Sequence, residues 1–294
     1  YSVLKAVAAK GAVPKSRSVA LKRLAGGSND VLTCVAKDDV LVRELLCILE
    51  STGDDRLQRA AYRLVGELIL RSKDGARKLA ERGGATTFGN VLKRYLAEGY
   101  PLQQYSPPHL LEELAKQTGR AKQIAEEVKD IMLDVLPPLV VEPAFVLDAP
   151  NAKELNIVKK DSIVLFRNML IPQLSMQFFE RVVPPDNFDR FIEKHMGSET
   201  GIEWLGKIVA NVAPSFAEKA VSVGAADVVL SKLADLATTP QDAKKMLTAL
   251  LTPLRQKLDS STSQHATLES RLADALCSRL VECGGIDGLL HRLS

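Results

Sequence analysis

The sequence predicts an all-α protein built from repeated groups of helices. Its 294 residues are 46% hydrophobic and 5% aromatic, which is enough apolar surface for a folded core and excludes a chain that is disordered throughout. Apolar residues recur at helical spacings of three and four over most of the chain. Similar patterns of helix, turn and helix return at several places, and this indicates an array of repeats.

The clearest helical segment runs from residue 41 to residue 70. Leu45 and Leu49 lie on one predicted apolar face, and a second face begins at Leu57 and continues through Leu68. The turn at residues 51–54 separates the two helices. Asp74 is expected to cap a short helix that follows, and the glycine pair at 83–84 is expected to end it.

The pattern of residues 60–96 returns in residues 201–236. Three small or apolar positions of the two segments align: Leu64 with Trp204, Leu68 with Ile208 and Gly84 with Gly224. A third copy closes the chain at 268–294, and a degenerate one opens it at 16–49. Each copy predicts a helix, a short helix, a turn and a further apolar helix.

These residues resemble the armadillo repeat, in which Ala-x-x-x-Leu-x-x-Leu is followed by a glycine turn and a second Leu-x-x-Leu helix. Residues 41–97 carry the resemblance best. It implies an armadillo/HEAT-like α-solenoid, whose stacked helical hairpins bind protein partners along a groove. The spacing departs from the family, because Gly84 and Gly224 are not separated by a multiple of about 42 residues. The groove asparagine of peptide-binding members has one candidate here, Asn211.

The sequence predicts three parts: basic N-terminal repeats at 1–97, a Pro-rich insertion at 98–200 and C-terminal repeats at 201–294. The insertion holds ten of the 14 prolines. Its first part, 106–136, is predicted to be helical, with Ser106 as the cap and Pro107 as the first residue. Residues 137–158 are predicted to be extended. Helix is expected again over 161–183, broken at Pro172, and from residue 185 to residue 195.

No group of residues predicts catalysis, a metal site or a cofactor. The segment Gly201–Lys207 approaches a phosphate-binding loop, but Ile208 stands where Ser or Thr would hold Mg²⁺, and helical spacing accounts for the same residues. The four histidines are dozens of residues apart. The cysteines are expected to be small buried residues, namely Cys34, Cys47, Cys277 and Cys283.

Basic residues concentrate near the amino terminus. Residues 1–100 hold 18 basic and 11 acidic residues, whereas residues 101–294 hold 21 and 25. The region 1–97 therefore suits an acidic protein or an anionic lipid surface. A basic edge is the candidate partner-binding site within it: Arg71, Lys73, Arg77, Lys78, Arg82, Lys93 and Arg94. Aromatic stacking platforms are missing nearby, which argues against nucleic acid as the partner.

Four phenylalanines of the insertion lie within 14 positions of one another: Phe178, Phe179, Phe188 and Phe191. Such a cluster is a candidate apolar surface for a partner, with a core between insertion and repeats as the alternative.

The longest apolar stretch is interrupted by prolines and falls short of the roughly 20 residues that a membrane-spanning helix needs. Four cysteines are too few for a disulfide framework, so an intracellular location is expected. The residues before Asp30 are basic and free of acids, which is typical of a solvated basic helix and also of mitochondrial targeting regions. The start at Tyr1 resembles a processed mature terminus. A mitochondrial location is therefore expected, with the cytoplasm as the alternative.

Together these features predict a non-catalytic α-solenoid scaffold or accessory structural subunit of a larger complex. The complex would be mitochondrial if the basic residues before Asp30 belong to a targeting region. Its partners would be proteins, bound through the groove and the central insertion. The resemblance also implies an alternative, because armadillo proteins include cochaperones that bind an Hsp70 transiently.

Overall fold

The computed structural model describes most of the chain from residue 14 to residue 260. The described residues are 14–51, 54–98, 105–140, 152–195, 199–209, 212, 214–222, 224–237, 239–260, 275, 278, 281 and 282. Within them, every regular element is a helix, which confirms the predicted all-α class. The chain divides into two compact units, Tyr1–Leu174 and Ser175–Ser294. The sequence-based boundaries at 97 and 200 mark changes of repeat pattern and stay a prediction.

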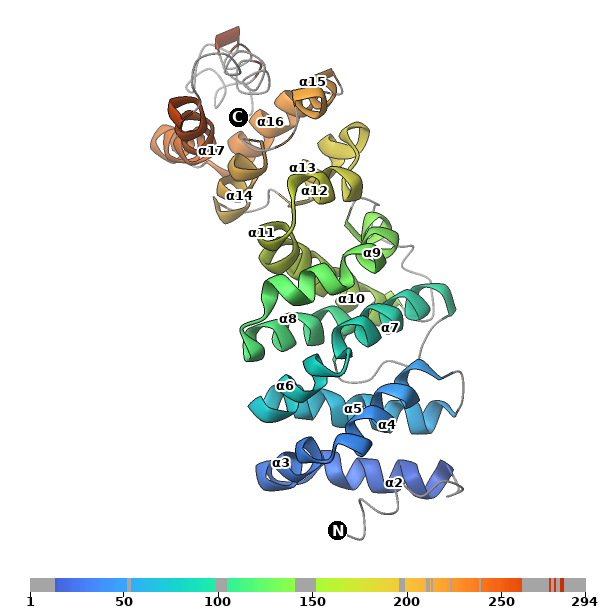
Figure 1. The fold of residues 1–294 in the computed structure, drawn as a ribbon. Helices are drawn as coiled ribbons and strands as arrows, with labels where there is room; N and C mark the ends of the chain where they lie inside the picture. Colours follow the sequence, from blue (N-terminus) through green and yellow to red (C-terminus); the bar gives the residue numbers. More distant parts are fainter. Residues whose placement is uncertain are drawn as a thin grey trace. The chain divides into compact units, whose positions relative to one another are not determined.

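The first unit is a stack of helices that follow one another in chain order, as the colours of Figure 1 show. In order, its helices are α2 (Pro14–Ala25), α3 (Asn29–Lys37), α4 (Asp39–Glu50), α5 (Asp55–Arg71), α6 (Lys73–Glu81), α7 (Gly84–Glu98), α8 (Pro107–Thr118), α9 (Ala121–Val140), α10 (Ala152–Leu165), a π-helical turn (Phe166–Leu170) and α11 (Ile171–Gln173).

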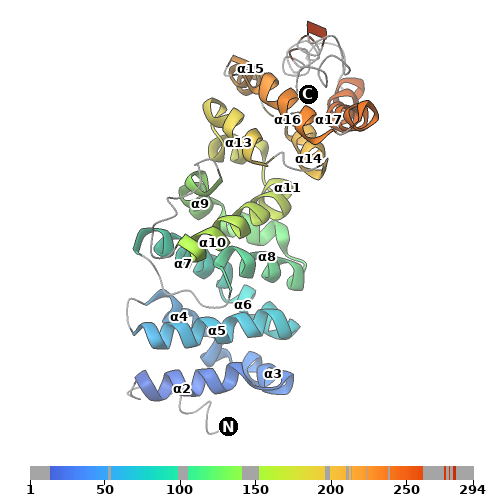
Figure 2. The same cartoon turned by 180° about the vertical axis from the view of Figure 1, so that it is seen from behind.

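Packing in the first unit repeats every three helices. Helix α2 contacts α5, α3 contacts α6, α4 contacts α7, and α5 contacts α8. The short nine-residue helices α3 and α6 thus occupy equivalent places, and α2 and α5 lie side by side in both views (Figures 1 and 2). A stack in which each helix meets its counterpart in the next group is a repeat architecture.

Helix α5 shows how the local sequence sets these elements. Asp54 caps its start, because its carboxylate accepts hydrogen bonds from the backbone N–H groups of Arg56 and Leu57 at 2.7 and 3.0 Å. The apolar face predicted from Leu57 to Leu68 is buried, with Leu64 and Leu68 at 0% exposure. The helix is packed by α2, α4, α6 and α8, so its outward face is a single narrow stripe.

The cap predicted for the next helix is wrong by two residues. Ser72, and not Asp74, begins α6, because the Ser72 hydroxyl oxygen accepts a hydrogen bond from the backbone N–H of Gly75 at 3.0 Å. Both residue types cap helices well. Ser72 takes the position because the chain leaves α5 directly before it, which sequence spacing alone does not fix.

The second unit follows the same three-helix order. Its elements are α12 (Met176–Val182), a 3₁₀ turn (Pro185–Asn187), α13 (Phe188–His195), α14 (Glu199–Val209), α15 (Pro214–Ser222), α16 (Ala225–Leu236) and α17 (Pro240–Ser260). Helix α13 contacts α16, and α14 contacts α17, so each again meets the helix three places later.

The similar sequence patterns of residues 60–96 and 201–236 correspond to the same order of helices. Helices α5, α6 and α7 match α14, α15 and α16, and the middle helix has nine residues in both cases. A glycine with positive φ precedes the third helix each time, Gly83 at 82° and Gly224 at 87°. The glycine equivalent to Gly224 is therefore Gly83, one residue before the Gly84 that the sequence alignment pairs with it.

The extended segment predicted over 137–158 is wrong wherever the structure describes it. Residues 137–140 finish α9, although Pro137 and Pro138 lie inside this last turn, and residues 152–158 belong to α10. Leu139 and Val140 are fully buried, so their packing outweighs the cost of the prolines. Residues 141–151 lie outside the described residues. Beyond them, α10 leads through the π-helical turn into α11, which ends just after Pro172.

The cap predicted at Ser106 is confirmed and does more than begin α8. Its hydroxyl oxygen accepts a hydrogen bond from the backbone N–H of His109 at 3.2 Å, and its hydroxyl donates to the Asp161 carboxylate at 2.5 Å. Pro107 is the first helical residue. Since Asp161 belongs to α10, this one serine both begins α8 and joins α10 to it.

Substituting Ser106→Ala is expected to destabilise the protein by about 1–2 kcal/mol, because a helix cap and a buried hydrogen bond are lost together. Urea unfolding followed by circular dichroism measures this change. Ser222→Ala is the matched control, since the exposed Ser222 hydroxyl donates only to the Lys219 carbonyl oxygen within its own helix. Equal stability of the two variants would contradict the double role of Ser106.

The prediction that Cys34 and Cys47 are buried is wrong. Both side chains are exposed, because Leu32, Val35 and Ala36 fill the inner face of α3 and six apolar residues fill that of α4. Cys277 and Cys283 lie outside the described residues.

Candidate protein-interaction surface

The predicted basic edge lies on the end of α5, on α6 and on α7. Except for exposed Lys73, every one of its seven side chains is bound to another group of the first unit. The six engaged residues are Arg71, Arg77, Lys78, Arg82, Lys93 and Arg94. Much of the positive charge that the sequence shows is therefore matched within the fold.

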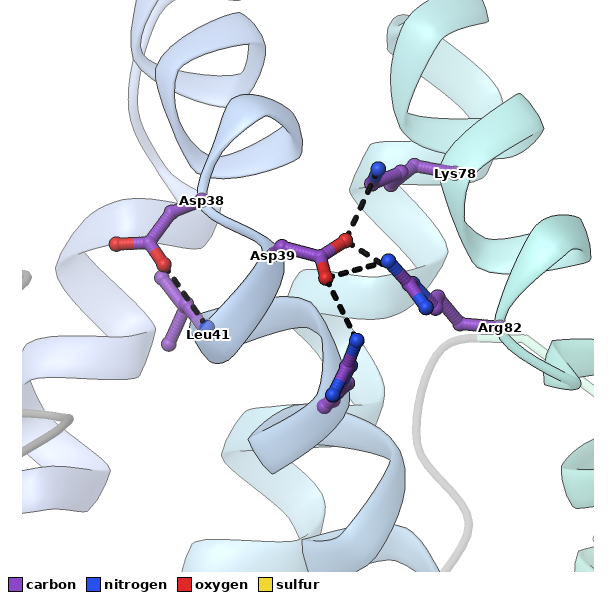
Figure 3. Close-up of polar contacts among 6 residues, drawn as sticks. Asp38, Asp39, Leu41, Lys78 and Arg82 are labelled. Carbon is purple, nitrogen blue, oxygen red and sulfur yellow. Dashed lines mark hydrogen bonds and ion pairs between the residues drawn. The ribbon is translucent and has the colours of Figure 1, made fainter.

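Asp39, the first residue of α4, collects three of the cations of this region (Figure 3). Its carboxylate lies 2.9 Å from the Lys78 ammonium and 2.5 Å from the Arg82 guanidinium, both on or just after α6. Arg43, one turn further along α4, contributes a third pair at 3.1 Å. Arg82 binds through two nitrogens, Nε and Nη2, one to each carboxylate oxygen. This group joins α4, the third helix of one repeat, to α6, the second helix of the next repeat.

Hydrogen bonds from Lys78 and then Arg82 lower the pKa of Asp39 from 3.8 to about 2. Because the pKa in the folded state lies below that of the unfolded chain, the stabilisation by this carboxylate is present above pH 3.8 and is lost as the pH falls towards 2.

Substituting Asp39→Asn is therefore expected to reduce the loss of stability that acid causes. Wild type should lose more free energy of unfolding than the variant between neutral pH and about pH 3. Chemical denaturation at the two pH values measures this difference. Asp74→Asn serves as the control, because Asp74 is more exposed and its pair is with Arg77 of the same helix. An unchanged acid dependence in Asp39→Asn would contradict the assignment.

Two further cations of the basic edge, Arg94 and Lys93, connect α7 to neighbouring helices. The Arg94 Nη1 donates to the carbonyl oxygens of Leu49, Glu50 and Ser51 at 3.0–3.2 Å, and so satisfies the carboxyl end of α4. Lys93 pairs with Asp134 of α9 at 2.7 Å. Both residues also line a cavity of about 410 Å³ between the end of α4 and α7.

The four phenylalanines of the predicted apolar surface lie inside the second unit, each at 2% exposure or less. Phe179 is central: its ring centroid lies 6.2 Å from that of Phe188, 5.6 Å from that of Phe191 and 6.0 Å from that of Phe216. Phe216 belongs to α15, in the region predicted as C-terminal repeats. The structure thus places Phe178, Phe179, Phe188 and Phe191 in a core, the alternative that the sequence also allows, and gives a partner no access to them.

A basic surface that the sequence analysis missed lies on α5. Arg56, Arg59 and Arg63 are exposed, and within the described part of the chain their side chains make no hydrogen bond or ion pair. We call these three residues the α5 arginine row. They follow one another at i, i+3 and i+7, so they point to the same side of the helix.

Two acids lie at a helical spacing of four from the row: Asp55 precedes Arg59 and Glu67 follows Arg63. Glu67 is already bound by its neighbours. Its two carboxylate oxygens meet the Arg71 guanidinium at 3.2 Å and the Tyr105 hydroxyl, which donates at 3.3 Å. Burial, and then the charge of Glu67, raises the pKa of Tyr105 above its usual value. Tyr105 also stacks on His109 of α8, with ring centroids 6.2 Å apart. Glu67 therefore does not neutralise the α5 arginine row.

The described residues contain no group of three or more metal-ligating side chains that could hold an ion. The phosphate-loop-like segment is part of α14, which confirms its helical interpretation. None of the described helices has the length and hydrophobicity to cross a membrane.

Solved structures similar to this chain include a designed armadillo repeat protein and other engineered proteins. One engineered protein matches over 87% of this chain and 98% of its own, with 16% identity and a TM-score of 0.49. A designed armadillo repeat protein matches over 94% and 98%, with 14% identity and a TM-score of 0.38. A second engineered protein matches over 95% and 99%, with 16% identity and a TM-score of 0.39.

No protein-family model and no curated protein matches the sequence. The three-helix period of each unit, and not these distant matches, defines the architecture. Short middle helices, glycine turns with positive φ and contacts to the third following helix occur together in it. The protein has an armadillo/HEAT-like helical repeat fold.

Proposed function

We propose that the protein is a non-catalytic scaffold for protein–protein interaction and works as an accessory subunit of a larger assembly. The observation that carries the proposal is the stacking of equivalent helices. Because α2 contacts α5 and α5 contacts α8, the outward faces of successive repeats join into one surface within the first unit. Such a surface is long for the number of residues that build it, and it suits extended contact with another protein.

Cross-linking mass spectrometry on native extract tests this function. The expected result is a reproducible set of cross-links from the first unit to one protein or a few proteins, with migration on a native gel well above the 32.0 kDa chain. Migration as a free monomer without specific cross-links would contradict the scaffold proposal. A transient, nucleotide-dependent complex with an Hsp70 would contradict permanent membership of an assembly and support the cochaperone alternative.

A further inference from the structure

We propose that the α5 arginine row binds an acidic segment of a protein partner, with Arg56, Arg59 and Arg63 each pairing with a carboxylate. This inference rests on the proposed scaffold function and names the chemistry of one of its contacts.

The geometry of α5 brings the three guanidinium groups together. A rise of about 1.5 Å per residue places the first and last of them about 10 Å apart along the helix axis. The residues between them that face the neighbouring helices are buried, with Ala60 and Tyr62 at 1% and 0% exposure. The arginines therefore form the exposed stripe of a helix that is otherwise packed, and their backbone positions are held by the stack.

The α5 arginine row differs from the basic edge in the pairing of its charges. An acid that approached Lys78 or Arg82 would compete with Asp39, which already binds both. An acid that approaches the α5 arginine row displaces no described intramolecular partner, since Glu67 is held by Arg71 and Tyr105. Partner carboxylates thus gain charge-assisted hydrogen bonds at the row without breaking existing ones.

The surroundings of the row favour an acidic protein over other anions. Surfaces that bind single-stranded nucleic acid usually combine arginines with exposed aromatic rings, but Tyr62 of α5 is fully buried and the ring of Tyr105 is stacked on that of His109. Anionic membranes are usually met by basic residues beside exposed apolar ones. Among the described residues, the large exposed apolar side chains are Val19, Val40, Ile157 and Val281, and none belongs to α5.

The test is a binding titration of the full chain with a fluorescent peptide in which glutamates alternate with small residues. Fluorescence anisotropy compares wild type with the triple variant R56Q/R59Q/R63Q. The matched control, R43Q/K73Q/R77Q, removes the same charge from exposed positions of the first unit that lie outside the row. Circular dichroism verifies that both variants keep their helices.

We expect the row variant to weaken peptide binding on the order of tenfold and the control about twofold or less, because three direct pairs are lost only in the row variant. The difference should shrink at high salt. Equal weakening by both variants, or none by the row variant, would overturn the inference. Row-dependent binding of a single-stranded oligonucleotide or of phosphatidylserine vesicles that is tighter than peptide binding would overturn the choice of partner. The titration uses a synthetic peptide, so its failure is distinct from a failure to find cross-linked proteins.

Discussion

Substituting Gly206→Ala is expected to destabilise the second unit by about 3 kcal/mol, because the helices α14 and α17 meet at this residue with no room for a side chain. A Cβ atom at Gly206 would lie 2.5 Å from the Leu250 carbonyl oxygen and 3.0 Å from its Cα. These are backbone atoms in the middle of α17, so relief requires the two helices to move apart. Urea unfolding, with hydrogen exchange of α14 and α17 as a local readout, measures the effect.

Gly89→Ala provides the matched control, since Gly89 also lies inside a helix and faces a neighbour closely. A Cβ there would lie 3.1 Å from the Cδ1 atom and 3.3 Å from the Cγ2 atom of Ile131, which belong to a side chain and not to backbone, so a small shift of that side chain relieves the contact. Alanine is also favoured over glycine inside a helix by about 1 kcal/mol, so this variant should remain within about 1 kcal/mol of wild type. If the two variants had the same stability, close approach of α14 to α17 would be contradicted.

Truncating Phe179→Ala is expected to cost about 3–5 kcal/mol, the range for removing a buried aromatic ring. Phe179 is 1% exposed, and its ring contacts those of Phe188, Phe191 and Phe216. The variant leaves a cavity where helices α12, α13 and α15 meet, and it removes edge-to-face contacts to two of these rings. Denaturant unfolding gives the free energy, and hydrogen exchange should show the loss in these helices.

Two further variants show whether the aromatic cluster is a core or a surface. Phe179→Leu fills part of the cavity and should be clearly less destabilising than alanine. Ile157→Ala, at a position that is 50% exposed, should change stability little. A Phe179→Ala variant as stable as Ile157→Ala would contradict burial of the cluster and restore these phenylalanines as candidates for partner binding.

Most helices and their repetition could be predicted from the sequence because their signals are local. The apolar spacing of 57–68, the Ser106–Pro107 start and the Asp54 cap of α5 each involve residues that are neighbours in sequence. Glycine turns could be located to within one residue for the same reason. Ser72 and Asp74 are equally suitable as caps of α6, and the end of α5 determines that Ser72 takes this position.

Features that depend on contacts distant in sequence could not be predicted in the same way. Asp39 and Arg82 are 43 positions apart, and only the folded structure shows that they pair and that the charge of the basic edge is largely matched. The helical path of Pro137 and Pro138 depends on burial of the residues that follow them. Burial of Phe188 and Phe191 likewise needs Phe216 of another helix.

The α5 arginine row did have a signal in the sequence. Arg56, Arg59 and Arg63 recur at i, i+3 and i+7, opposite the apolar face of the same segment. Attention to the apolar residues alone hides this pattern. The sequence does not show whether each arginine is paired with an acid. Only the folded structure shows that the three side chains are exposed and have no described partner.

The most direct measurement of the central claim is hydrogen–deuterium exchange of the full chain with and without the glutamate-rich peptide. If the protein is a repeat scaffold that receives an acidic segment on the α5 arginine row, added peptide should slow exchange in α5 and its neighbours α2 and α8, and R56Q/R59Q/R63Q should abolish this protection. Protection confined to α6 and α7, or protection that survives the triple substitution, would contradict the account.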